Sequence, residues 1–416
     1  MQVNNAERRP RAFAAVAFVF VVVMMGTTLP SPLFGLYEQT LGISPLTVTV
    51  LYAIYAFGVV LALLLAVPVS ARLGRRPMLA TALLLSGAAA LAFLLSDNVI
   101  VLLAARVLSG LAAGAVTGTA TDALIAFGGT AYRGRSAMIG IAANMVGLAL
   151  GTGVAGGVAD LGYRPLQLPF IVDFGLVVVA CAVLLSVPRD NGPRSAGTSA
   201  SAHPRALVSA AGHVRGVFLP AAISGGLGFA ANGLIPTVTA VFLSRYLGIG
   251  SHLVAGCLIS LVFLATALGQ LLARRRGPRE TQLVGTGGLI VGLVVFAGAI
   301  GWNGLILFVV ATVLIGVSTG TCIGAGIAHL AEVTPIEHRP AVVTAYFILL
   351  YLLLAVPVIG FGVLLDHTTL HLGAALFSAV GVVVLLGTLL RSLRGSRETA
   401  PLPVEVVTNN VTSKGN

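Results

Sequence analysis

Twelve apolar stretches, each about as long as a membrane-spanning helix, follow one another along the chain with only short polar breaks. A stretch of about 20 apolar residues satisfies its backbone inside a bilayer only as a helix. The stretches occupy residues 12–34, 48–70, 77–95, 99–127, 136–158, 168–187, 215–243, 251–273, 281–300, 304–331, 340–365 and 370–392. With 57% hydrophobic and 9% charged residues, the chain does not resemble a soluble domain. The pattern predicts an all-α membrane protein with 12 transmembrane helices.

The basic residues fall almost entirely on one side of these spans. Of the 24 lysines and arginines, 21 lie on one side, two (Arg164 and Arg245) lie on the other, and Arg106 lies within a span. Positively charged loops remain in the cytoplasm. We therefore expect a multi-pass protein of the cytoplasmic (cell) membrane with both termini in the cytoplasm. This topology accounts for the net charge of +11, so no nucleic-acid partner is expected.

A polar segment rich in Gly, Ser, Pro and Arg divides six spans from six. The predicted organisation is a six-helix bundle (1–188), a cytoplasmic linker (189–214), a second six-helix bundle (215–393) and a disordered tail (394–416). The halves also resemble each other at an offset of 206 residues. At that offset Leu41-Gly42-Ile43 recurs as Leu247-Gly248-Ile249, and Gly110, Gly114 and Gly118 recur as Gly316, Gly320 and Gly324. Two pseudo-symmetric bundles with a site between them are typical of secondary transporters.

Three short motifs carry a resemblance to a known family. The loop after the second span contains Ala71-Arg72-Leu-Gly74-Arg75-Arg76, the fourth span contains Arg106-Val-Leu-Ser-Gly110-Leu-Ala-Ala-Gly114, and the fifth contains Gly147-Leu-Ala-Leu-Gly151-Thr-Gly-Val-Ala-Gly156. With the twelve spans, these motifs resemble the major facilitator superfamily (MFS), and the third is similar to a motif of its 12-helix drug:proton antiporters. The resemblance implies a gating loop that includes Arg72, Gly74, Arg75 and Arg76. It also implies helix packing through Gly110, Gly114, Gly147, Gly151 and Gly156.

Alanine replaces the acids that the family pattern has at two gating positions, Ala71 in the loop and Ala126 near the end of the fourth span. In the second half, Glu332 is present at the position equivalent to Ala126. We therefore expect Glu332 to lie near the arginines at 274–276 and to belong to the gate. The missing acids also predict a weaker outward-facing gate than in relatives with the full motif.

Four charged or titratable residues in the spans are candidates for chemistry. An arginine in the membrane costs roughly 2.5–3.5 kcal/mol, so Arg106 is expected to face a cavity or a partner. The resemblance implies a role in substrate binding or proton coupling; the alternative is a structural arginine bonded to backbone carbonyls. Asp122 is a candidate proton carrier or a partner of a loop arginine. Asp173 is interpreted as an anchor against a neighbouring helix end, with proton coupling as the alternative, and His329 as a coupling candidate or a packing residue.

Asn144, Asn232 and Tyr346 are the remaining candidates for substrate contact, and Thr27 and Tyr351 are further polar positions on the spans. Interhelical hydrogen bonds alone could explain each of them. No metal site and no cofactor are expected, and the chain is not expected to be an enzyme.

The resemblance implies a monomeric secondary transporter whose partners are a small molecule, protons and the lipid bilayer. The main hypothesis is proton-coupled efflux of hydrophobic or amphipathic molecules such as drugs and antibiotics. One alternative is a proton-coupled carrier for a metabolite such as a sugar or an organic acid. A second alternative is a membrane sensor that binds without transport.

Overall fold

The computed structural model describes residues 3–128, 133–188 and 214–398, together with positions 207, 209, 211 and 212. Side chains at 3–9, 66–73, 133–134 and 394–398 are not described. The first half contains α1 (Val3–Thr28), the 3-10 turn η1 (Ser31–Leu33), α2 (Phe34–Leu41), α3 (Pro45–Leu73), α4 (Arg75–Leu94), α5 (Val99–Gly128), α6 (Arg133–Ala159) and α7 (Leu168–Leu184). The second half contains α9 (Arg215–Val241), the π-turn η4 (Phe242–Tyr246), α10 (His252–Leu272), α11 (Pro278–Gly301), α12 (Leu305–Val333), α13 (Arg339–His367) and α14 (Leu370–Glu398).

The predicted all-α membrane fold is confirmed. Among the described residues, eleven helical segments are long and apolar enough to cross a membrane, and α7, with 17 residues, is a shorter apolar helix. The first span differs from its prediction because α1 ends at Thr28 and the chain enters η1 through Pro30. Proline has no backbone N–H for the helical ladder, which explains the break between α1 and α2. The last helix continues to Glu398, five residues into the predicted tail; residues 399–416 lie outside the described part.

The internal repeat is visible in the backbone. Gly42 and Gly248 occupy equivalent positions, and both have positive φ angles, of 62° and 67°. Glycine adopts this left-handed conformation at little cost because it has no Cβ. In the first half, Gly110 and Gly114 bring α5 against α3, where a Cβ would collide with the Tyr55 carbonyl oxygen and the Ala62 side chain. In the second half, Gly316 and Gly320 bring α12 against α10 in the same way.

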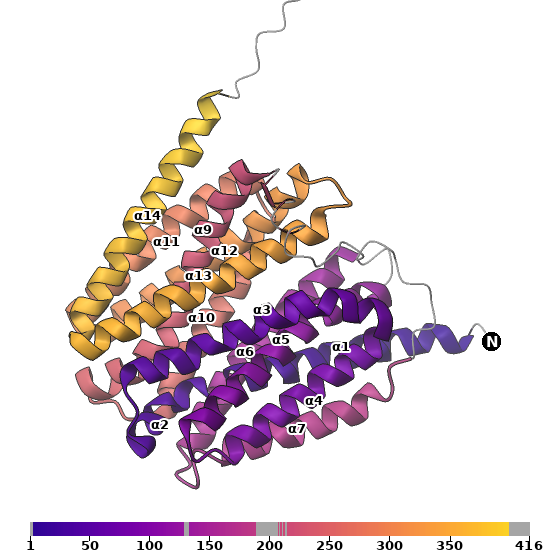
Figure 1. The fold of residues 1–416 in the computed structure, drawn as a ribbon, viewed down its shortest axis with the longest axis horizontal. Helices are drawn as coiled ribbons and strands as arrows, with labels where there is room; N and C mark the ends of the chain where they lie inside the picture. The colour runs from indigo at the N-terminus through magenta and orange to yellow at the C-terminus, as the bar shows by residue number, and fades with distance from the viewer. Residues whose placement is uncertain are drawn as a thin grey trace, which may run out of the picture.

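The two halves meet along two pairs of helices: α6 packs on α10, and α3 packs on α13. We name the ends of the molecule after the predicted topology, so that the end with the described chain termini is the cytoplasmic end and the opposite end is the outer end. In Figure 1 the helices of the two halves lie together at the outer end and diverge toward the cytoplasmic end.

The crossing of α6 and α10 is made by glycines from both halves. A Cβ on Gly156 would collide with the His252 carbonyl oxygen, and a Cβ on Gly256 would collide with the Thr152 carbonyl oxygen. Gly147 and Gly151 hold the same helix against α1. The backbones of the halves are therefore in direct contact near the outer end, as is usual where small residues line a helix crossing.

Candidate functional site

Arg106 lies in the interior of the first half and joins three helices. Its side chain is 1% exposed. Nε donates to the Leu51 carbonyl of α3 at 2.8 Å, and Nη1 donates to the Thr27 carbonyl of α1 at 2.7 Å. Thr27 is in the last turn of α1, where carbonyls have no partner in their own helix. Arg106 therefore caps the C-terminal end of α1, where the first span is interrupted.

Three aromatic rings surround the guanidinium of Arg106. Its Cζ lies 5.4 Å from the ring centre of Phe34 and 5.5 Å from those of Tyr52 and Tyr55. Such cation–π contacts stabilise a desolvated guanidinium. Within the described residues Arg106 forms no ion pair with a carboxylate. This geometry agrees with the structural alternative, and a role in binding or coupling stays a prediction.

The rings near Arg106 continue across the boundary between the halves. The Tyr55 ring lies 6.3 Å from Tyr351 of α13, and Tyr351 lies 5.5 Å from Phe229 of α9, both edge to face. We call Tyr52, Tyr55, Phe229 and Tyr351 the aromatic cluster. Of these four residues, only Tyr351 was predicted from the sequence. The i, i+3 spacing of Tyr52 and Tyr55 is a signal for the others, because it places two polar rings on one face of an aliphatic span.

Two predicted amides lie at similar depth on α6 and α9, two helices that both contact α10. Asn144 lies on α6, 16 residues before Asp160, and Thr266 lies on α10, 14 residues after His252. Because α6 packs on α10, these similar distances along the two helices place Asn144 and Thr266 at about the same depth. Asn232 Nδ2 donates to Thr266 Oγ1 at 2.9 Å. The amide oxygens of Asn144 and Asn232 have no hydrogen-bond partner in the described structure. Both amides can therefore accept further hydrogen bonds at mid-membrane depth.

The other predicted residues lie apart from the aromatic cluster. Tyr346 is fully buried inside the second half, with its hydroxyl between Gly225 and Gly326. Asp122 is exposed and has a charge interaction with Arg75, the first residue of α4. This contact agrees with the alternative in which Asp122 is a partner of a loop arginine. His329 is half-buried on α12.

The predicted gating residues are only partly described. Gly74 has a φ of 95°, which explains the glycine between α3 and α4. Arg76 is half-buried, and the side chain of Arg72 lies outside the described residues. Glu332 is exposed and forms no ion pair with Arg274, Arg275 or Arg276 in the described structure. The proposed partnership of Glu332 with these arginines is therefore absent from this conformation.

Asp173 is a second buried ionisable group in the first half. It is 2% exposed, and its Oδ1 has no hydrogen-bond partner among the described residues. It packs beside Gly26 of α1, where a Cβ would lie 2.9 Å from Asp173 Oδ2 and 3.1 Å from Ser86 Oγ. Gly26 is near the C-terminal end of α1, which carries partial negative charge. Asp173 therefore lies against the end of a neighbouring helix, and its role as an anchor stays a prediction.

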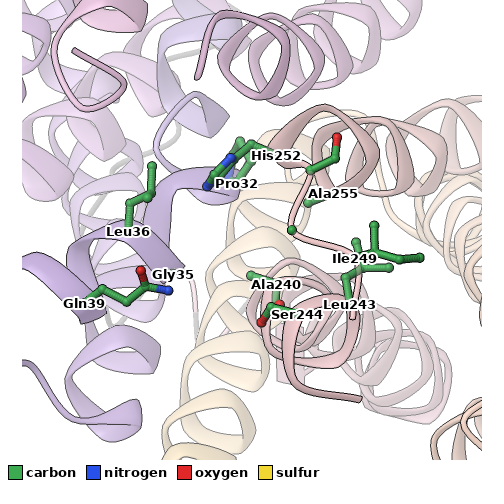
Figure 2. A pocket seen from close by; sticks show the side chains of 12 residues that line it. Pro32, Gly35, Leu36, Gln39, Ala240, Leu243, Ser244, Ile249, His252 and Ala255 are labelled. Atoms are coloured by element: carbon green, nitrogen blue, oxygen red, sulfur yellow. The ribbon is translucent and has the colours of Figure 1, made fainter. Parts of the chain in front are cut away.

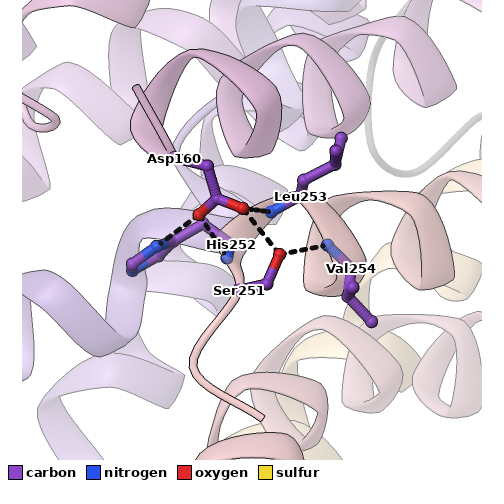
Figure 3. Close-up of polar contacts among 5 residues, drawn as sticks. All are labelled: Asp160, Ser251, His252, Leu253 and Val254. Atoms are coloured by element: carbon purple, nitrogen blue, oxygen red, sulfur yellow. Dashed lines mark hydrogen bonds and ion pairs between the residues drawn. The ribbon is translucent and has the colours of Figure 1, made fainter. Parts of the chain in front are cut away.

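The outer end holds a set of contacts between the halves that was not predicted from the sequence. Asp160 follows α6 in the first half and accepts four hydrogen bonds from the start of α10 in the second (Figure 3). The donors are Ser251 Oγ at 2.6 Å, the His252 and Leu253 amides at 2.7 and 3.1 Å, and His252 Nδ1 at 3.0 Å. A carboxylate at a helix N-terminus satisfies free amides and the helix dipole together.

Two more carboxylates join the halves at the same end. Arg245 Nη2 donates to Glu38 Oε1 at 2.9 Å, and the Leu46 amide at the start of α3 donates to Asp366 Oδ1 at 3.2 Å. We call the contacts of Glu38, Asp160 and Asp366 the outer gate. We call the conformation with these contacts formed outward-closed, after the predicted topology.

The hydrogen bonds of the outer gate favour the ionised form of Asp160. Burial alone would raise the pKa of this carboxyl. The hydrogen bonds from Ser251, from the Leu253 and His252 amides and from the His252 ring outweigh that effect and lower the pKa to about 2. Hydrogen bonds to the charged form of an acid lower its pKa in this way.

Comparisons with known proteins agree with this architecture. The sequence pattern of the Major Facilitator Superfamily matches residues 16–356. The chain is similar to a crystal structure of the nucleoside transporter NupG, with 12% identity, a TM-score of 0.72, and coverage of 92% of this chain and 99% of that one. It is also similar to the xylose transporter XylE from E. coli in a partially occluded inward-open conformation, with 15% identity, a TM-score of 0.69, and coverage of 91% and 97%.

No curated protein matches the chain. At 12% and 15% identity the two structural matches show a shared fold. The predicted membership of the drug:proton antiporter branch is not confirmed by these comparisons.

Proposed function

Because the chain belongs to the Major Facilitator Superfamily, we propose that it carries a small polar metabolite with a ring, such as a sugar or a nucleoside. Transport would proceed by alternate opening of the outer and cytoplasmic ends around a site between the halves. This proposal takes the alternative of a metabolite carrier in place of the main hypothesis of drug efflux.

The observation that carries the proposal is the aromatic cluster at the boundary between the halves. Tyr55 of the first half contacts Tyr351 of the second, and Tyr351 in turn packs against Phe229. Tyrosine combines a flat apolar face with a hydroxyl, a combination suited to rings that carry polar groups. The free amide oxygens of Asn144 and Asn232 add acceptors for hydroxyl or amine groups. An apolar drug would leave these polar atoms without partners, which is costly in a dry site.

The solved structures that resemble this chain support the same choice at the level of fold. Their names describe a nucleoside transporter and a xylose transporter. Both classes of substrate are ring compounds with several hydroxyl groups, so they suit a site made of tyrosines and amides.

A proteoliposome assay tests the function. We expect labelled sugars or nucleosides to exchange across the membrane, and we expect Tyr351→Ala to weaken binding by about tenfold, the effect of losing ~1.4 kcal/mol of ring and hydroxyl contacts. Tyr163→Ala, which removes an exposed ring outside the cluster, is the matched control. Transport of a lipophilic cation without exchange of any sugar or nucleoside would restore the drug-efflux hypothesis. Binding without flux would favour the sensor.

Proton coupling is the second part of the proposal, and we assign it to Asp173. The carboxyl is buried without a cation among the described residues, which favours its neutral, protonated form. Asp173 packs beside Gly26 of α1, and the carbonyl of the next residue, Thr27, accepts a hydrogen bond from Arg106. Loss of the proton would place a charge beside the end of α1 and disturb that contact.

We expect Asp173→Asn to abolish proton-driven accumulation while exchange of labelled substrate across the membrane continues. Asparagine resembles the protonated acid in shape, so the fold should be retained. Asp122→Asn is the control, because Asp122 is exposed and interacts with Arg75. Accumulation that survives in Asp173→Asn and is lost in Asp122→Asn would transfer the coupling role to Asp122.

A further inference from the structure

A small cavity opens at the outer end between the two halves. Its volume is about 290 Å³. One wall is formed by η1 and α2 of the first half, and the other by α9, η4 and the start of α10 of the second (Figure 2). Gln39 and Ser244 at its rim are exposed. Because both halves form its walls, the cavity exists only while the outer gate is closed.

Three polar side chains of this cavity, His252, Ser244 and Gln39, can offer hydrogen-bond acceptors. The carboxylate of Asp160 accepts from His252 Nδ1 at 3.0 Å, and in the tautomer with its proton on Nδ1 the Nε2 atom of the ring is an acceptor. Ser244 Oγ donates to the Ala240 carbonyl at 2.7 Å, which leaves the lone pairs of its oxygen free to accept. The Gln39 amide can accept as well.

The charge around the cavity is also suited to a cation. The α9–η4 helix ends here with partial negative charge, while the partial positive charge of the α10 N-terminus, which also lines the cavity, is met by the Asp160 carboxylate. Asp160 lies directly behind His252, while the positive charge of Arg245 is neutralised by Glu38. Ser251, whose hydroxyl donates to Asp160, also lines the cavity, and Leu36, Leu243 and Ile249 form an apolar part of the lining.

From these features we infer that the cavity is a binding site for a small protonated amine with an apolar body, which enters from the outer side and holds the protein outward-closed. At this volume the site takes a ligand of fragment size, since drug-sized ligands fill roughly 300–1,000 Å³. A ligand that binds only one of two states shifts the equilibrium toward that state. At 100 times its dissociation constant, such an amine would favour the outward-closed state by about 100-fold.

The probe is phenethylamine, and 3-phenylpropionate, which has a similar body and the opposite charge, is its matched control. Spin labels at Leu95→Cys and Trp302→Cys report the opening of the outer end, in a protein whose Cys181, Cys257 and Cys322 are replaced by alanine. Leu95 and Trp302 are 74% and 80% exposed and lie in outer loops of opposite halves. We expect the amine, and not the acid, to raise the outward-closed population and the thermal unfolding midpoint.

Ser244→Phe should fill the cavity and abolish the response to the amine. Thr40→Phe, which adds the same ring to an exposed position of α2 outside the cavity, should retain it. An equal response to the acid, or an unchanged response in Ser244→Phe, would overturn the inference. The comparison of amine with acid in the unsubstituted pocket remains decisive if Ser244→Phe does not fold.

Discussion

Asp160→Ala is expected to shift the protein from the outward-closed toward the outward-open state by about 30-fold. The substitution removes a carboxylate that accepts hydrogen bonds from two amides, a hydroxyl and an imidazole at the start of α10. Loss of a helix N-cap with charge-assisted hydrogen bonds costs about 2 kcal/mol, which corresponds to the stated factor. The distance between spin labels at positions 95 and 302 measures the shift.

The same contact predicts the effect of pH on the outer gate. The Asp160 pKa is lowered from 3.8 to about 2 in the outward-closed state. The contribution of this carboxyl to closure is therefore fully present above pH 4 and is lost as the pH falls toward 2. The Asp160→Ala variant should lack this part of the pH dependence. Asp97→Ala, at another outer loop, is the control. An unchanged label distance in Asp160→Ala would mean that Glu38, Asp366 and the glycine crossing hold the gate without it.

Arg106→Met is expected to destabilise the first half by about 2 kcal/mol. Loss of the two hydrogen bonds to carbonyls costs roughly 2 kcal/mol of stability each, and loss of the ring contacts costs about 1 kcal/mol. Removal of the buried charge regains about 3 kcal/mol, the cost of placing an arginine in the membrane. The substitution also releases the Thr27 carbonyl, so the break between α1 and α2 should loosen. Thermal unfolding in detergent measures the loss as a lower midpoint.

The conservative variant separates structure from transport at this position. Arg106→Lys retains the charge but offers a compact ammonium in place of a planar fork, so it should lose part of the stability. Arg276→Met removes an exposed arginine and should leave the midpoint unchanged. If Arg106→Met unfolds at the same temperature as the unsubstituted protein but no longer transports, the role in binding or coupling implied by the family resemblance is the correct one.

The sequence predicted those parts of the structure that depend on local pattern. The spans follow from runs of apolar residues, and the repeat follows from glycines such as Gly42 and Gly248, whose backbone conformations agree. Arg106 could be identified because a charge inside an apolar span is rare. The burial of Asp173 could not be predicted, because it depends on the absence of a side chain at Gly26 of another helix.

The contacts of the outer gate could not be predicted from the sequence for a similar reason. Asp160 stands in a polar loop, where acids are ordinary, and only the packing of α6 on α10 brings it to the start of a helix 92 residues later. The sequence directed attention to the gating loop at the cytoplasmic end, where family motifs exist. It provided no comparable motif for the opposite end.

The glycine crossing of α6 and α10 bears on how abruptly the halves separate. Long side chains in an interface can follow a partner that moves away, but Gly156 and Gly256 bring bare backbones together. Dispersion between such surfaces falls by a quarter to a half when a gap of about 0.5–1 Å opens. The crossing therefore gains little from partial contact, and the helices are either in contact or apart. This makes the closure of the outer end a two-state event, with few intermediate openings through which a solute or a proton could leak.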